Sequence, residues 1–424
     1  MRSPLRRLLA VGAAVLVSLT VVATPAEASS NRYVKVGYFT QWGIYGRQFP
    51  VANLQTSGAA SKLTHINYAF SDVTEQGLCA SADPWADWQV PFPAETSVDG
   101  VADVAGQPIS GNLNQLAELK AANPRLRVLV SLGGWTLSKW FSDAAATAQS
   151  RQRLVDSCVD LWLKGNLPGL APGAGAGIFD GIDLDWEWPG SEGNAGNVIR
   201  PEDKHNFTRL LATFRDALDR LGRAEHHKYE LTAFLPAAPA KIDAGFEARK
   251  IFKYLDFGTV QGYDFHGSWE QRANQQSALK VPAGAPDNPD FSITTTIDAW
   301  LDRGAPRGDL VLGLPYYGQG WTGVTDGLFG AATGPAPGLF AAGTEDYKTL
   351  KNLPAEGYTV HRDRRAGHTY LYDGTTFWTF DDPEQLLQKT NYIKNKGLGG
   401  AMMWSLDGDD ANASLTRAIA RGLR

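Results

Sequence analysis

Short runs rich in β-branched and aromatic residues recur along the chain from residue 34 onward, and a longer segment separates each run from the next. Residues of these types favour strands, and an apolar run of about four to eight residues fits a buried strand. The runs are Val34–Phe39, His65–Phe70, Arg127–Leu132, Gly181–Trp186, Glu230–Phe234, Gly258–Tyr263, Leu310–Pro315 and Gly399–Trp404. The pattern therefore predicts eight strands.

The longer segments carry apolar residues three or four positions apart, which is the spacing of an amphipathic helix. The predicted helices are Gly111–Ala122, Gln152–Lys164, Pro201–Leu221, Glu384–Asn395 and Leu415–Leu423. Strands that alternate with helices favour a parallel sheet, and eight such strands close a (β/α)8 barrel. We therefore expect an α/β fold, a TIM barrel that spans residues 32–424.

One interval of about 65 residues, between Pro315 and Pro383, breaks this alternation. It contains Gly- and Pro-rich turns and two short aromatic runs, His368–Tyr372 and Thr376–Phe380. A simple connection between a strand and a helix is much shorter. The interval therefore predicts a small α+β insertion subdomain over residues 318–380, after the seventh strand. Because loops at that end of a barrel form its active face, the insertion is expected to wall a cleft.

The beginning of the chain has a different pattern from the rest. Three arginines precede an apolar stretch, Leu8–Ala23, and Ala26-Glu27-Ala28 has small residues on both sides of a polar one. This is the layout of a secretory signal peptide, and the apolar part is short for a membrane-spanning helix. We expect residues 1–28 to be a signal peptide and the mature protein to be secreted and extracellular. An uncleaved anchor is the alternative.

Charge and composition narrow the class of partner. The chain has 40 basic and 45 acidic residues, a net charge of −5, and this mild balance favours neither nucleic acid nor a membrane surface as a partner. The seven histidines show no metal-ligand spacing, so we expect no metal and no cofactor. An exported protein can oxidise Cys79 and Cys158 to a disulfide, but the sequence leaves open whether they pair.

Three acidic residues, Asp183, Asp185 and Glu187, follow one another at a spacing of two. In a strand such residues share one face, about 7 Å apart in steps of two. Like charges raise the pKa of a neighbouring carboxyl, so at least one of the three should hold a proton near neutral pH. A carboxylic acid of this kind can donate a proton to a leaving oxygen.

Two alternatives exist for this acidic row. A solvated row on an exposed strand is disfavoured because the intervening residues are apolar, namely Phe179, Ile182, Leu184 and Trp186. A site for a hard cation remains possible, since three carboxylates could hold one. Asp180 is out of phase with the other three, and we expect it to form hydrogen bonds near the start of the strand.

The segment Asp180–Glu187 matches the DxxDxDxE signature of family-18 glycoside hydrolases. Further elements resemble this family in the right order along nearly the whole mature chain. They are Tyr38-Phe39 and Asn67–Phe70 in the first two strands, Ser131–Trp135 at the end of the third, Tyr263-Asp264 on the sixth and Trp404 on the eighth. The insertion resembles that of the groove-forming bacterial chitinases, with an actinomycete-like character. Three residues depart from the usual pattern, namely Trp188, Gln261 and Gly262.

This resemblance implies a secreted chitinase that hydrolyses β-1,4-N-acetylglucosamine linkages of chitin and chitooligosaccharides. The implied mechanism is retaining and substrate-assisted, because the acetamido oxygen of the substrate attacks the anomeric carbon and forms an oxazolinium ion. Glu187 would be the acid, Asp185 would hold the acetamido N–H, and Asp183 would share a proton with Asp185. Tyr263 would orient the acetamido oxygen.

The resemblance and the positions of aromatic residues also suggest substrate-binding side chains. Asp264 is expected to contact the distorted sugar, and Trp404 to form the floor of its pocket. Three tryptophans just after predicted strands are expected to stack on sugar rings, and Tyr38 is a further expected contact. These tryptophans are Trp135, Trp269 and Trp321.

Two other functions share parts of this pattern. An endo-β-N-acetylglucosaminidase acting on N-glycans would carry the same carboxylates, but such enzymes usually lack the long insertion. A non-catalytic chitin-binding lectin on this barrel would typically lack the acid at the position of Glu187. We expect the protein to act as a monomer.

Overall fold

The computed structural model describes Met1, residues 32–286 and residues 291–424. The predicted signal peptide therefore lies, except for Met1, outside the described residues. Residues Arg32–Arg424 group together as one unit, which contains all the elements described below.

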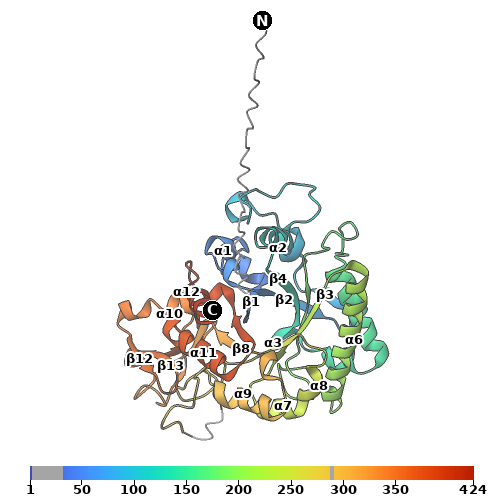
Figure 1. Ribbon diagram of the computed structural model, residues 1–424. Coiled ribbons are helices and arrows are strands. Elements are labelled where there is room, and N and C mark those ends of the chain that lie inside the picture. The colour runs from blue at the N-terminus through green and yellow to red at the C-terminus, as the bar shows by residue number, and fades with distance from the viewer. Residues whose placement is uncertain (2–31, 287–290) are drawn as a thin grey trace. The chain divides into compact units, whose positions relative to one another are not determined.

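Eight parallel strands form a closed ring in this unit (Figure 1). They are β1 Val34–Thr40, β2 His65–Val73, β4 Arg127–Gly133, β5 Gly181–Asp185, β6 Glu230–Leu235, β7 Phe257–Val260, β8 Leu310–Pro315 and β15 Gly400–Trp404. The ring closes because β1 pairs with both β2 and β15. The predicted TIM barrel is therefore confirmed, and all eight predicted strands are present.

Two strand ends differ from the prediction in a way that affects the site. β5 ends at Asp185 and β7 ends at Val260, so Glu187 and Tyr263 lie just beyond their strands. Residues past the carboxyl end of a barrel strand belong to the rim where βα loops gather. Glu187 lies beyond its strand, as the predicted end at Trp186 already implied, whereas the earlier end of β7 moves Tyr263 from its strand to the mouth of the barrel.

Helices cover the outside of the barrel, and the apolar strands are buried on both faces, as expected for a parallel sheet. The helices are α1 Ala52–Thr56, α2 Gly111–Ala122, α3 Gly134–Leu137, α4 Phe141–Ala145, α5 Ala148–Cys158, α6 Asp203–Glu225, α7 Pro239–Gly245, α8 Ala248–Ile251, α9 Ile293–Asp302, α10 Tyr347–Leu350, α11 Pro383–Lys396 and α12 Ser414–Gly422. The five predicted helices are all present; α2 has its predicted ends, and the ends of the other four are shifted. α5, for example, begins earlier because Thr147 and Ser150 form a capping box.

A second, antiparallel sheet lies between β8 and α11, with β12 and β13 at the edge of the unit (Figure 1). Its strands are β9 Tyr317–Thr322, β10 Gly334–Pro335, β11 Thr344–Asp346, β12 Thr359–Asp363, β13 His368–Tyr372 and β14 Phe377–Phe380. A small apolar cluster that includes Trp321 and Phe377 packs within it. The α+β insertion after the seventh barrel strand is therefore confirmed, and its first strand starts directly after β8.

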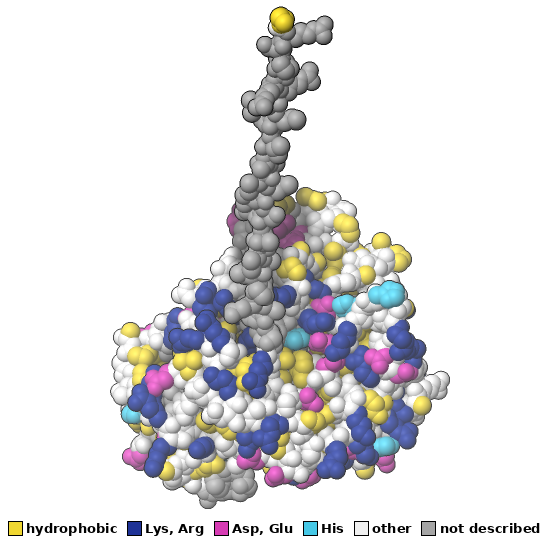
Figure 2. All heavy atoms as spheres, viewed as in Figure 1, with side chains coloured by type: hydrophobic (Ala, Val, Ile, Leu, Met, Phe, Trp, Pro, Cys, Tyr) yellow, Lys and Arg dark blue, Asp and Glu magenta, His cyan; other side chains and the backbone are white. Residues whose placement is uncertain are grey.

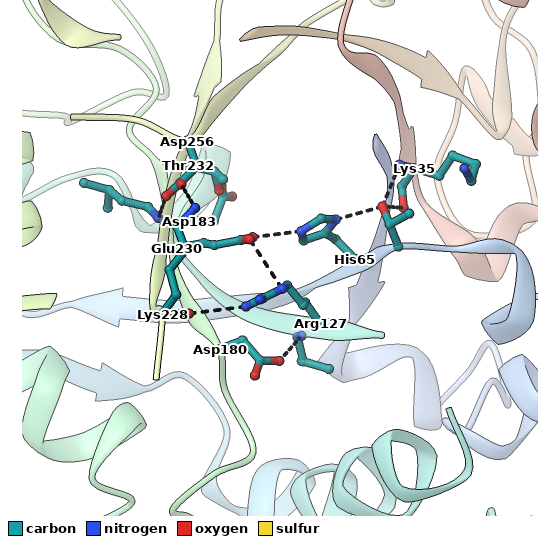
Figure 3. Close-up of polar contacts among 12 residues, drawn as sticks. Lys35, His65, Arg127, Asp180, Asp183, Lys228, Glu230, Thr232 and Asp256 are labelled. Carbon is teal, nitrogen blue, oxygen red and sulfur yellow. Dashed lines mark hydrogen bonds and ion pairs between the residues drawn. The ribbon is translucent and has the colours of Figure 1, made fainter. Parts of the chain in front are cut away.

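The opposite end of the barrel carries a polar network (Figure 3). His65, Arg127 and Glu230 are the first residues of β2, β4 and β6. His65 Nε2 lies 2.8 Å from Glu230 Oε2, and Arg127 Nε lies 3.4 Å from Glu230 Oε1. Burial raises the pKa of Glu230, but these partners outweigh burial and lower it below its usual value. Polar contacts at this end of a barrel stabilise the fold and leave chemistry to the other end.

Asp180 belongs to the same end. Its Oδ2 accepts a hydrogen bond from the Val128 N–H at 2.8 Å and lies 2.8 Å from Lys120 Nζ. The expectation that Asp180 forms hydrogen bonds near the strand's start is confirmed.

The surface in Figure 2 shows Lys and Arg side chains dispersed among smaller groups of Asp and Glu. In the part of the chain that the structure describes, every helix is too short or too polar to cross a membrane.

Cys79 and Cys158 form a disulfide, which decides the question that the sequence left open. Cys79 begins β3 Cys79–Ser81, a short strand that pairs with the end of β2, and Cys158 ends α5. The bond joins residues 79 positions apart, and the Cys79 N–H also donates to Ser157 Oγ. The extension of β2 is therefore fixed to an outer helix.

Replacing both cysteines with alanine should destabilise the protein. A cross-link over a loop of this length stabilises a fold by about 2–4 kcal/mol, chiefly by restricting the unfolded chain. We expect the double variant to lose that free energy of unfolding in guanidinium titration. An unchanged midpoint would contradict this, and the single variants serve as controls for side-chain packing.

Candidate active site

The three predicted carboxylates come together at the carboxyl end of β5, and all three are buried. Asp183 and Asp185 lie on the strand, and Glu187 is two residues further along. Partners of Asp183 come from three other barrel strands, so its side chain points into the barrel. The spacing of two therefore does place the acidic row on the inner face.

Asp183 receives hydrogen bonds from three hydroxyl groups. Tyr38 OH and Ser131 Oγ each donate to its Oδ2 at 2.7 Å. Thr232 Oγ1 donates to its Oδ1 at 2.5 Å, and Figure 3 labels both of these residues. Burial raises the pKa of Asp183, and the three hydrogen bonds oppose but do not cancel this effect. Asp183 is thus held from β1, β4 and β6 at once.

This network corrects the prediction for Tyr38. Its side chain is only 1% exposed and contacts Asp183, so it offers no surface to a substrate. It belongs to the layer beneath the site.

Thr232 was not predicted, although a hydroxyl residue within the apolar run Leu231–Leu235 was an available signal.

Asp185 differs from its neighbour because its Oδ1 is buried with no hydrogen-bond partner among the described residues. Burial, with the added charges of Glu187 and Asp183, raises the pKa of Asp185 well above its usual value. A buried acceptor without a donor costs about 1–3 kcal/mol. Such an atom is suited to accept a hydrogen bond from a ligand.

Burial raises the pKa of Glu187 to about 8, with the charge of Lys241 lowering it and that of Asp264 raising it. Its backbone is held on both sides. The Glu187 N–H donates to Ser138 Oγ at 2.9 Å, and its carbonyl oxygen accepts from Asn197 Nδ2 at 2.9 Å. Glu187 is therefore a protonated acid at neutral pH on a fixed backbone.

The predicted pair Tyr263-Asp264 follows β7 and meets the insertion. Asp264 has a φ of 55°, and its Oδ1 accepts from Gln319 Nε2 at 2.9 Å. The rings of Tyr263 and Tyr317 are 6.1 Å apart. Burial and the nearby carboxylates raise the pKa of Tyr263, which keeps its hydroxyl protonated as a donor. Tyr317 and Gln319 on β9 were missed, because only the fold brings them here.

Trp404, the last residue of β15, lies against two aromatic rings near Asp183. Its ring centroid is 5.3 Å from that of Tyr38 and 5.7 Å from that of Phe70. Trp404 is half-buried, so part of its ring faces outward. A contact between Trp404 and a sugar stays a prediction.

Among the described residues, no three His, Cys, Asp or Glu side chains form a group that could hold a metal ion. The cation alternative for the acidic row therefore has no support in this geometry.

Residues 34–409 match the family described as glycosyl hydrolases family 18. The chain belongs to this family. Chitinase 63 of Streptomyces plicatus is 40% identical over 92% of this chain and 60% of its own, and chitinase A1 of Niallia circulans is 37% identical over 93% and 59%. The chain thus spans about three fifths of the length of these relatives.

A solved structure agrees with this assignment. The catalytic domain of psychrophilic chitinase B from Arthrobacter TAD20 is 46% identical, with a TM-score of 0.90 over 93% of this chain and 96% of that domain. The described part of this family 18 chain therefore corresponds to a catalytic domain of similar extent.

The three tryptophans expected to stack on sugars divide into two kinds. Trp269 is 63% exposed and Trp135 is 49% exposed, so both present flat faces to solvent. Trp321 is fully buried in the insertion sheet, and its Nε1–H donates to the Glu270 carbonyl at 3.0 Å. The prediction that Trp321 stacks on a sugar was wrong. Its position shortly after a predicted barrel strand suggested an exposed ring, but the sheet of the insertion covers it.

The variants Trp321→Ala and Trp269→Ala should differ in stability, because the first tryptophan is buried and the second is exposed. The first variant empties a fully buried site and should lose about 3–5 kcal/mol of unfolding free energy. The second removes an exposed ring and should stay within about 0.5 kcal/mol of the parent. Urea titration of both measures the difference. Equal losses would contradict the assignment of Trp321 to the core and Trp269 to the surface.

Proposed function

We propose that this family 18 protein is a chitinase, which hydrolyses β-1,4 linkages between N-acetylglucosamine units of chitin and chitooligosaccharides. The observation that carries the proposal is the pairing of two buried groups at the barrel mouth. Glu187 is a carboxylic acid with a pKa of about 8, and beside it Asp185 has an acceptor oxygen that none of the described residues bonds. The relatives named chitinases support the same substrate class.

The proposed reaction is retaining and uses the substrate's own N-acetyl group. Protonated Glu187 gives its proton to the glycosidic oxygen while the bond from that oxygen to the anomeric carbon breaks. The acetamido oxygen forms a new bond to the same carbon, which yields an oxazolinium ion. Glu187, now a carboxylate, takes a proton from water as the water oxygen attacks that carbon, and the acetamido group is restored.

The other acidic groups stabilise this intermediate. Asp185 Oδ1 accepts the acetamido N–H, which gives the buried oxygen its missing partner and places negative charge near the positive ring. Asp183, held by three hydroxyls, fixes the position of Asp185 from below and shares a proton with it. Tyr263 donates to the acetamido oxygen and orients it for attack.

The substrate would lie along the rim. Asp264 contacts the reacting sugar and Trp404 supports it, while the exposed rings of Trp135 and Trp269 stack on neighbouring sugars. The insertion supplies Tyr317 and Gln319 behind Asp264, so it forms one wall of the cleft. We propose that the mature protein is secreted and acts as a monomer.

Glu187→Gln should abolish hydrolysis while binding remains, because the swap removes the proton at nearly constant shape. We expect the release of oligomers from colloidal chitin to fall by roughly a thousandfold or more. Glu202→Gln is a matched control, since Glu202 is exposed at the start of α6 and forms no side-chain cap. A fully active Glu187→Gln variant would refute the assignment.

The activity of the wild type on chitin and on a glycopeptide also distinguishes the candidate functions. If it releases nothing from chitin but cleaves a high-mannose glycopeptide, the protein is an endo-β-N-acetylglucosaminidase instead. If it binds chitin oligomers and cleaves neither substrate, it is a lectin.

The mechanism predicts that cleavage depends on an N-acetyl group on the reacting sugar. Acetylated chitohexaose should be cut, and fully deacetylated chitosan should not, since glucosamine has no acetamido oxygen. Mass spectrometry of partially acetylated products should show an acetylated sugar at every new reducing end. New ends that carry glucosamine would contradict the proposed nucleophile.

A further inference from the structure

Trp188, one of the residues that depart from the usual family pattern, directly follows Glu187 and is buried. One partner is Phe234, whose ring is stacked on the indole at 5.5 Å. The other is Lys241, whose Nζ lies 5.1 Å from the indole centroid. Trp gives the strongest cation–π attraction of the aromatic side chains. The Lys241 cation therefore lies over the side chain of the residue that directly follows the proposed acid.

The helix that carries Lys241 is locked onto the segment after Glu187. A Cβ added at Gly245 would come within 2.2 Å of the Pro189 carbonyl oxygen, and one added at Gly190 within 2.7 Å of the Ala244 carbonyl oxygen. Both glycines allow α7 and residues 188–190 to touch backbone to backbone. The position of Lys241 relative to Glu187 is thus set by rigid packing.

Lys241 also stands out among its basic neighbours. It is half-buried, yet within the described ranges it forms no hydrogen bond and no ion pair within 4 Å. Nearby Lys204 and Arg303, in contrast, both contact Asp243. A partly desolvated ammonium without a direct partner is costly, and burial lowers the pKa of Lys241 while Glu187 and Glu192 raise it.

The other ionisable groups that face Glu187 are acids and tyrosines. Asp185 ends β5 two residues before Glu187, Asp264 and Tyr263 follow β7, and Tyr317 begins β9 of the insertion. The charge of Lys241 lowers the pKa of Glu187, and it opposes both burial and the charge of Asp264, which raise that pKa. The balance between these groups decides when Glu187 releases its proton.

We propose that Lys241, held over Trp188, is a positioning residue that acts through Glu187 and sets the upper pH limit of catalysis. Its ammonium favours the Glu187 carboxylate that remains after the proton has passed to the glycosidic oxygen. Lys241 keeps its own protons throughout. A group that acts first as an acid and then as a base works best when its protonated and ionised forms are both populated near the working pH. Burial disfavours the ionised carboxylate, and a nearby cation stabilises it.

This inference rests on the proposed role of Glu187, and the test is the pH profile of kcat/KM on a soluble chitooligosaccharide. The direction of the pH dependence follows because the protonated form of Glu187 is the active one. Activity should fall as pH rises through about 8, the pKa of Glu187. Lys241→Met removes the stabilising cation and should move this fall to higher pH by about one unit. Lys241→Arg keeps the charge and should keep the wild-type profile.

Lys204→Met is the matched control, since Lys204 contacts the same helix through the Asp243 carbonyl and should leave the profile unchanged. Lys241→Gln replaces Lys241→Met if the latter does not fold. A uniform loss of activity with an unmoved alkaline limb would overturn the inference and leave the proposed function intact, provided that Glu187→Gln is inactive. An active Glu187→Gln variant would instead overturn the proposed function.

Discussion

The burial of three carboxyl groups at the end of one strand is the constraint around which the site is built. Asp183, Asp185 and Glu187 cannot all be ionised in a space that excludes water, because each charge disfavours the next. The surrounding residues respond differently to each one. Three hydroxyl groups donate to Asp183, Asp185 keeps an acceptor oxygen that no described residue bonds, and the raised pKa of Glu187 favours its protonated form. One repulsive arrangement thus yields three distinct chemical roles.

Much of this arrangement follows from periodicity. Alternation with a period of two placed the acids on one face, and the alternation of strands and helices predicted the barrel, because both patterns are local and repeat. Burial of single aromatic residues is not local. Tyr38 lies within a predicted strand and Trp321 follows one, yet the first is buried beneath Asp183 and the second inside the insertion sheet. Their surroundings come from segments far away along the chain.

The same reason explains the residues that the sequence did not reveal. Ser138 and Asn197 hold the backbone of Glu187 from positions 49 and 10 residues away, and Gln319 reaches Asp264 across 55 residues. None of them belongs to a motif with a chemical meaning of its own. Only the closed barrel and its insertion bring these side chains to the carboxylates, so spacing along the chain carries no signal for them.

Closure of the ring has a consequence for when the candidate site is complete. Tyr38 is on the first barrel strand and Trp404 on the last, and β1 pairs with β15 to complete the ring. A chain that is still emerging from a ribosome lacks this pairing, so the ring contact between Tyr38 and Trp404 cannot form until residue 404 has been made. Assembly of the site therefore requires strands from both sides of the ring's closure, because Tyr38 comes from β1 and its ring partner Trp404 from β15.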